Sequence, residues 1–151
     1  MKRRGMISCP AGLTRIGGLK VQDALTALIA VLVVLQVKHF FCDYTLQTLY
    51  MLRNKGTYLH PGGIIHSGLH AAASISAFLV VMPTVLLGVG LVVGEFLVHY
   101  HIDWSKEQVI KRTGWTAVMP QYWWAFGADQ LLHQLTYLVM ALILVKQMMG
   151  G

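Results

Sequence analysis

Residues 64–98, IIHSGLHAAASISAFLVVMPTVLLGVGLVVGEFLV, decide the fold of this chain. Apart from Glu95, the stretch contains no Asp, Glu, Lys or Arg. As one helix it would be about 52 Å long, well above the roughly 30 Å of a bilayer's hydrocarbon core. Pro83 disfavours an unbroken helix. The stretch therefore predicts two membrane spans, residues 64–82 and 84–103.

The composition of the whole chain indicates a membrane protein. Hydrophobic residues make up 56% of the 151 positions and charged residues only 12%, about half the charged share of a soluble domain. Working outward from residues 64–98, a first span is expected at 23–43 and a last one at 129–146. We predict an all-α integral membrane bundle of about four transmembrane helices.

The remaining segments give the predicted domain organisation. Residues 1–22 form a basic N-terminal extension, and residues 23–148 form a single transmembrane helical domain. The net charge of +6 suits an anionic membrane surface. The sequence has no basic stripe interleaved with aromatic residues, so a nucleic-acid partner is not expected. An interfacial segment is expected between helices three and four, since tryptophan favours the membrane–water boundary. Its aromatic residues are Trp115, Tyr122, Trp123, Trp124 and Phe126.

Ionisable side chains gather at one end of each predicted span. If the spans alternate in direction, these four ends fall at the same membrane face. Residues four apart share one helix face, so each helix would present polar side chains to the bundle centre. The pairs are His39/Asp43, His66/His70, Glu95/His99, His99/Asp103 and Asp129/His133.

Imidazole and carboxylate groups suit zinc, iron or manganese, and helical bundles build metal sites from such inward-facing side chains. A divalent metal, with zinc as one candidate, is therefore the expected cofactor. Its predicted ligands are His39, Asp43, His66, His70, His99, Asp103, Asp129 and His133. Glu95 and Asp43 are the candidate general bases. Gln47, His101, Lys106 and Gln130 are expected to support the ligands by hydrogen bonds.

Two glycines and two lysines carry expectations about packing and charge. Gly90 and Gly94 form a small-xxx-small pair, which predicts close packing of spans two and three. Lys38 is expected to extend its ammonium group to the interface. Binding of an anionic head group is the alternative role for Lys38, and it is also open to Lys106.

Four motifs, in order along the chain, resemble those of a family of small phage and bacterial integral membrane proteins of unknown function. They are KHFFCDYTLQ at 38–47, HSGLH at 66–70, His101-Ile102-Asp103 with Lys106, and Asp129-Gln130 with His133. The resemblance covers residues 38–146 and implies a multi-pass protein of a bacterial inner membrane, without a reaction. The family pattern gives weight to His101, whereas helix spacing favours His99. A weaker similarity is to bacterial membrane-bound metal-dependent hydrolases.

Three functions remain open on the sequence. The first is a metal-dependent hydrolase acting on a lipid-like or interfacial substrate. The second is a transporter, channel or pore-forming protein that binds a cation or proton. The opposite membrane face is nearly all Leu, Val and Ala, which counts against a continuous path unless a homo-oligomer forms one. The third is a structural or partner-binding membrane protein whose polar cluster only fixes helix packing.

Overall fold

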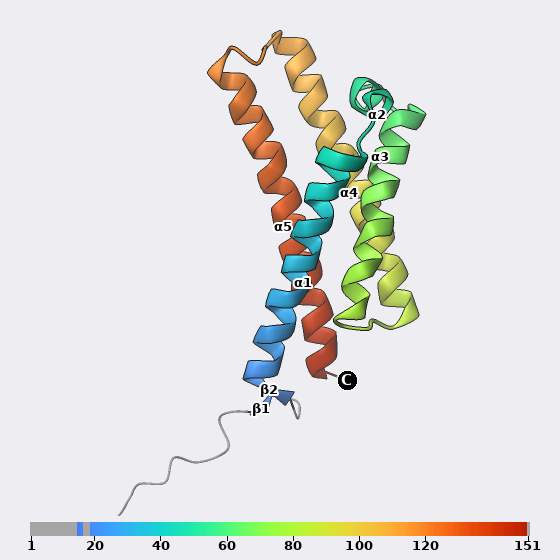
Figure 1. The fold of residues 1–151 in the computed structure, drawn as a ribbon, viewed down its shortest axis with the longest axis vertical. Helices are drawn as coiled ribbons and strands as arrows, with labels where there is room; N and C mark the ends of the chain where they lie inside the picture. Colours follow the sequence, from blue (N-terminus) through green and yellow to red (C-terminus); the bar gives the residue numbers. More distant parts are fainter. Residues whose placement is uncertain (1–14, 17–18, 151) are drawn as a thin grey trace, which may run out of the picture.

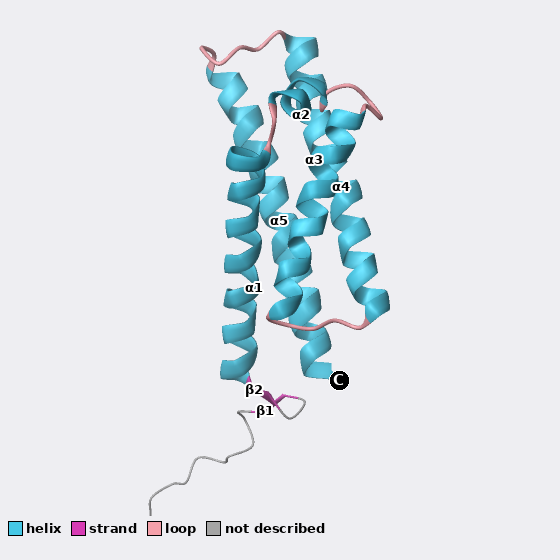
Figure 2. Ribbon diagram, turned by 45° about the vertical axis from the view of Figure 1, so that its right-hand side comes forward, coloured by secondary structure: helices cyan, strands magenta, loops and turns pink. Residues whose placement is uncertain are grey.

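The computed structural model describes residues 15–16 and 19–150, which are almost wholly helical (Figures 1 and 2). The elements are β1 (Arg15–Ile16), β2 (Leu19–Lys20), α1 (Val21–Phe41), the π-helical turn η1 (Cys42–Leu46), α2 (Leu49–Asn54), α3 (Pro61–Ala73), the 3₁₀ helix η2 (Ser74–Leu79), α4 (Val85–Thr113) and α5 (Pro120–Gly150). The two short strands pair antiparallel. The predicted all-helical class is confirmed. Most of the expected extension 1–22 lies outside the described residues.

Three helical segments are long and apolar enough to cross a membrane. They are Val21–Leu46, Val85–Thr113 and Pro120–Gly150. The prediction of four such helices is wrong at the second span. There the α-helix α3 has only 13 residues, a length of about 20 Å, and the backbone tightens into the 3₁₀ helix η2 at Ser74.

The bundle has four segments: α1, α3 with η2, α4 and α5. They alternate in direction, so the end of each segment and the start of the next lie at the same end of the bundle. The chain ascends in α1, descends through α3 and η2, ascends in α4 and descends in α5 (Figure 1). The break expected at Pro83 is present, because residues 80–84 separate η2 from α4. Thr84 caps α4 by accepting a hydrogen bond from the backbone N–H of Leu87.

The far end of α4 differs from the expectation. The helix continues past Asp103 through the charged residues to Thr113, and Gly114 ends it at φ 69°, a left-handed conformation in which glycine is favoured. Residues 114–119 link α4 to α5. Trp123 and Trp124, expected in an interfacial segment before the last span, lie instead in the first turns of α5, where they are exposed.

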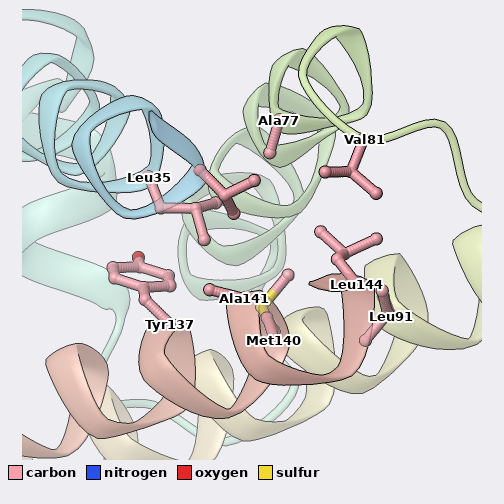
Figure 3. Close-up of a cluster of buried hydrophobic side chains, with 9 residues drawn as sticks. Leu35, Ala77, Val81, Leu91, Tyr137, Met140, Ala141 and Leu144 are labelled. Carbon is pink, nitrogen blue, oxygen red and sulfur yellow. The ribbon is translucent and has the colours of Figure 1, made fainter. Parts of the chain in front are cut away.

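An apolar core fills the half of the bundle nearest the described chain ends (Figure 3). Its buried members are Val31, Leu35, Ala77, Val81, Leu91, Tyr137, Met140, Ala141 and Leu144. Many large apolar side chains instead point outward, Leu79 and Leu86 among them, which is the pattern expected where lipid is the solvent. The buried polar residues lie in the opposite half of the bundle.

Gly90 and Gly94 do not pack against α3 or η2. A Cβ atom added at either position would meet nothing within 4 Å, so the predicted use of this pair between spans two and three is wrong. The contact instead runs through Gly88, where a Cβ would lie 3.3 Å from Phe78. The spacing of two glycines indicates a helix face without bulky side chains, but the arrangement of the neighbouring helices decides what packs against that face.

Candidate metal centre

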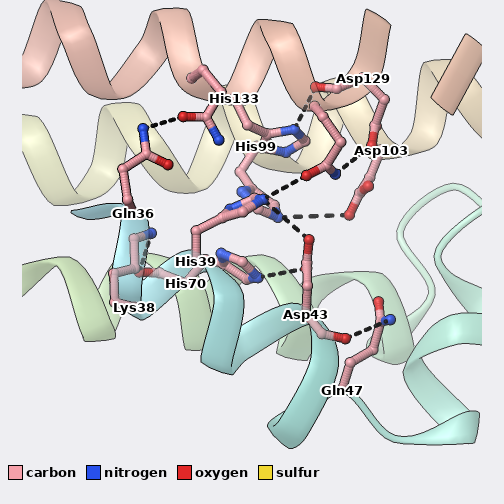
Figure 4. Close-up of polar contacts among 12 residues, drawn as sticks. Gln36, Lys38, His39, Asp43, Gln47, His70, His99, Asp103, Asp129 and His133 are labelled. Atoms are coloured by element: carbon pink, nitrogen blue, oxygen red, sulfur yellow. Dashed lines mark hydrogen bonds and ion pairs between the residues drawn. The ribbon is translucent and has the colours of Figure 1, made fainter. Parts of the chain in front are cut away.

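The structure gathers all eight predicted ligands into one cluster, in which all but Asp43 are buried; Figure 4 labels all of them except His66. They come from four parts of the fold: His39 from α1 and Asp43 from η1, His66 and His70 from α3, His99 and Asp103 from α4, and Asp129 and His133 from α5. The alternating course of the chain and the four-residue spacing on each helix produce this convergence. Only Asp43 has a side chain more than a tenth exposed, at 16%.

Three histidines direct Nε2 atoms toward two carboxylates. His66 Nε2 lies 3.1 Å from Asp103 Oδ2 and 3.3 Å from His99 Nε2. His70 Nε2 lies 3.1 Å from Asp43 Oδ1. Three overlapping sets keep their ligand atoms within 4.8 Å of one another: His39/His70/His99, Asp43/His66/His70 and His66/His99/Asp103.

The chemistry of these atoms fits a divalent cation. Asp103 Oδ2 is buried and makes no hydrogen bond among the described residues, although His66 Nε2 is 3.1 Å away. Neutral imidazole nitrogens that carry lone pairs and a carboxylate oxygen are the ligand types of zinc sites. The Nδ1 atoms of His66, His70 and His99 also have no described partner, and a metal on the Nε2 side would leave them unpaired.

A buried ion pair forms the deep end of the cluster. Lys38 and Glu95 are 7% and 2% exposed, and the ammonium group donates to Glu95 Oε1. Lys38 Nζ also donates to the Tyr137 hydroxyl at 3.0 Å. The expectation that Lys38 extends to the interface is wrong, because the buried Glu95 carboxylate needs a compensating charge. Glu95 belongs to none of the three ligand sets.

Tyr137 links Lys38 to His39. An ammonium group can only donate, so the Tyr137 hydroxyl accepts from Lys38 Nζ at 3.0 Å, and the same hydroxyl lies 2.8 Å from His39 Nδ1. His39 Nε2 lies 3.1 Å from Asp43 Oδ2 and 3.2 Å from Gln130 Oε1. His39 therefore contacts Asp43 directly, and it also belongs to one of the three ligand sets.

We expect Tyr137→Phe to lower the free energy of unfolding by about 1–3 kcal/mol, the cost of leaving buried polar groups unpaired. Tyr137 is fully buried, and its hydroxyl is the partner of both Lys38 and His39. Thermal unfolding of the detergent-solubilised chain measures the change. Tyr44→Phe is the matched control, because Tyr44 is 64% exposed. An equal effect of the two substitutions would contradict the role of the Tyr137 hydroxyl.

Two lysines close the outer end of the cluster. Lys55 Nζ lies 3.2 Å from Asp103 Oδ1, which leaves Oδ2 of the same carboxylate directed at the histidines. Lys106 Nζ lies 3.8 Å from Asp129 Oδ2 and 3.9 Å from Asp103 Oδ1. Sequence reasoning missed Lys55 and Tyr137, and it placed the ammonium group of Lys38 at the interface. The available signal was charge balance, because buried acids require cations nearby.

The other predicted residues lie around this arrangement. Asp129 faces Lys106 and belongs to none of the three ligand sets. His133 Nδ1 lies 2.8 Å from the Asp129 backbone carbonyl oxygen, and its ring meets that of His99 edge to face with the centroids 4.1 Å apart. The structure places His99 in the cluster, whereas His101 is exposed and bonded to its own helix. Gln47 accepts from Lys55 at 3.4 Å.

The fold and the cluster define a helical protein with three helices apolar enough to span a membrane and a buried His/Asp site that could hold a metal ion. A family model described as "Protein of unknown function (DUF3307)" matches residues 31–150. The chain belongs to this family, and the matched segment contains the whole cluster. No curated protein and no solved structure matches the chain.

Proposed function

We propose that this protein is a membrane-embedded, metal-dependent hydrolase acting on a lipid-like or interfacial substrate. The observation that supports it is the convergence of buried Nε2 atoms and carboxylates beside one partly exposed carboxylate, Asp43. The bilayer surrounds α1, α4 and α5, and α3 with η2 completes the bundle as a fourth embedded segment. The protein resides, in this proposal, in a bacterial inner membrane.

The proposed ligands are His66, His70, His99 and Asp103, with zinc as the first ion to test. Their side chains are 0–5% exposed, and the two sets that include His66 overlap around this residue. A divalent ion supplies positive charge that stabilises a developing negative charge and eases the ionisation of water.

Asp43 is the proposed general base. Its side chain is the most exposed of the cluster, at 16%, so water and substrate can reach it. His39 Nε2 donates to Oδ2, which orients the carboxylate and leaves Oδ1 facing His66 and His70. In hydrolysis Asp43 accepts the proton of the attacking water and returns it to the oxygen of the leaving group.

The apolar core argues for this function over transport by a single chain. Val31, Leu35, Met140 and Leu144 fill the bundle between the cluster and the opposite end, and a proton or cation path needs polar groups along its length. The buried Asp103 Oδ2, which makes no hydrogen bond among the described residues, also argues against a purely structural network. A network that only fixed helix packing would satisfy its hydrogen bonds.

The test uses the purified full chain, loaded with zinc and reconstituted into vesicles of phosphatidylethanolamine and phosphatidylglycerol. We expect lipid cleavage products by mass spectrometry, and their loss on chelation of the metal. Asp43→Asn should keep its zinc but lose at least about 100-fold in turnover, the contribution of a general base. Asp23→Asn, an exposed acid at the start of α1, is the matched control. Absence of products from the zinc-loaded wild type would refute the proposal.

A further inference from the structure

A groove runs along α4 and α5 on the outside of the bundle. Its inner part has a volume of about 570 Å³ and its outer part about 800 Å³, and the two parts share Val98, Ile102 and Leu132 as walls. Along α4 the groove extends from Gly90 to Val109, which corresponds to about 28 Å of helix. This length is close to the thickness of a bilayer's hydrocarbon core.

The inner part of the groove is open beside two glycines of α4 that do not pack against a neighbouring helix. Gly90 and Gly94 line it, and the space beside them is free of other atoms within 4 Å. The remaining walls are almost entirely aliphatic. In a membrane, lipid hydrocarbon chains cover such an aliphatic surface, because the bilayer core contains no water.

Each part of the groove is lined by one buried carboxylate. Glu95 lines the inner part and Asp129 the outer part, and they are 2% and 3% exposed. Glu95 Oε2 and Asp129 Oδ1 each have no hydrogen-bond partner among the described residues. A buried acceptor without a partner indicates a donor that the described residues do not supply.

The outer part also has the features of a head-group site. Lys106 lines it, with Nζ 3.8 Å from Asp129 Oδ2, and Oδ1 of the same carboxylate has no hydrogen-bond partner among the described residues. Trp115 and Trp124 form part of the same wall, and tryptophan favours the level of the lipid head groups. Lys106 lies 3.9 Å from Asp103, which connects the groove to the proposed metal centre.

We infer that the groove binds one membrane phospholipid whose head group carries hydrogen-bond donors. Its hydrocarbon chain lies along Gly94 and Gly90, its phosphate pairs with Lys106, and a hydroxyl or ammonium group donates to Asp129 Oδ1. The inference rests on the proposed function and names the substrate class that reaches the centre.

Filling the groove tests the inference. The metal-free full chain is extracted from vesicles of phosphatidylethanolamine and phosphatidylglycerol, and retained lipid is counted by native mass spectrometry. We expect the wild type to keep one phospholipid and Gly94→Leu to lose at least tenfold in occupancy. The leucine side chain enters open space and replaces a poor helix former, so the variant should fold.

Gly127→Leu is the matched control, because Gly127 also has no neighbour within 4 Å and lies outside the groove. Equal lipid retention by both leucine variants would overturn the inference. A wild-type dimer that Gly94→Leu converts to a monomer would overturn it in favour of a second copy. Because the measurement uses metal-free protein, either result leaves the hydrolase proposal to its own test.

The head group is tested by competition between lipids. Phosphatidylcholine has a phosphate but no hydrogen-bond donor, so the wild type should retain phosphatidylethanolamine or phosphatidylglycerol at least fivefold more often. Asp129→Asn should reduce this preference while keeping a chain in the groove. The lipid retained more often, phosphatidylethanolamine with its ammonium group or phosphatidylglycerol with its hydroxyl groups, identifies the donor whose hydrogen bond Asp129 accepts. Equal retention of all three lipids would overturn the head-group assignment.

Discussion

Replacing His66 with asparagine is expected to weaken zinc binding by at least about 100-fold, since even residues behind the ligands of a metal site contribute 10–100-fold to affinity. His66 belongs to two of the three ligand sets. Its Nε2 lies 3.1 Å from Asp103 Oδ2 and 3.5 Å from Asp43 Oδ1. No other histidine lies this close to both carboxylates among the pairs that the structure describes.

Competition with a zinc-binding dye measures the affinity of the detergent-solubilised chain, and elemental analysis gives the stoichiometry. His60→Asn is the matched control. His60 lies outside the cluster and caps α3 by accepting a hydrogen bond from Gly62, a role that asparagine also fills. Unchanged zinc affinity in His66→Asn would contradict the proposed ligand set, as would a wild-type protein that binds no zinc.

The convergence of the cluster was predictable because it depends on two regular features. Helical periodicity places His66 and His70 on one face, and the same rule applies to His99 and Asp103. The break at Pro83 makes neighbouring segments run in opposite directions, which brings these faces to the same end of the bundle. Both features are local, and a single sequence contains them.

What the sequence did not predict depends on the distances between helices. Lys38 bonds Glu95 and Tyr137 across the bundle, and Lys55 reaches Asp103 from the segment before α3. Long side chains can point inward or outward from one position, and only the surrounding charges decide between the two. The open face at Gly90 and Gly94 and the change to a 3₁₀ helix at Ser74 likewise follow from tertiary packing.

Replacement of Lys38 by methionine is expected to lower the free energy of unfolding by about 3–5 kcal/mol, the cost of leaving a buried charge without its partner. Glu95 would keep its carboxylate in the interior with no cation beside it. Methionine has nearly the length of the lysine stem, so loss of packing contributes little. Thermal and chemical unfolding in detergent measure the change. Lys146→Met, at an exposed position of α5, is the matched control.

The double variant Lys38→Met/Glu95→Gln separates the ion pair from every other effect of the lysine. Removing the carboxylate charge should recover about 2 kcal/mol or more relative to Lys38→Met, since a buried charge pair replaced at both ends is often close to neutral. The coupling energy of the two sites follows from the four unfolding free energies. A double variant no more stable than Lys38→Met would show that lysine acts through Tyr137 and the His70 carbonyl. The hydrogen-bond chain to His39, and not charge balance, would then explain why a lysine is buried at this depth.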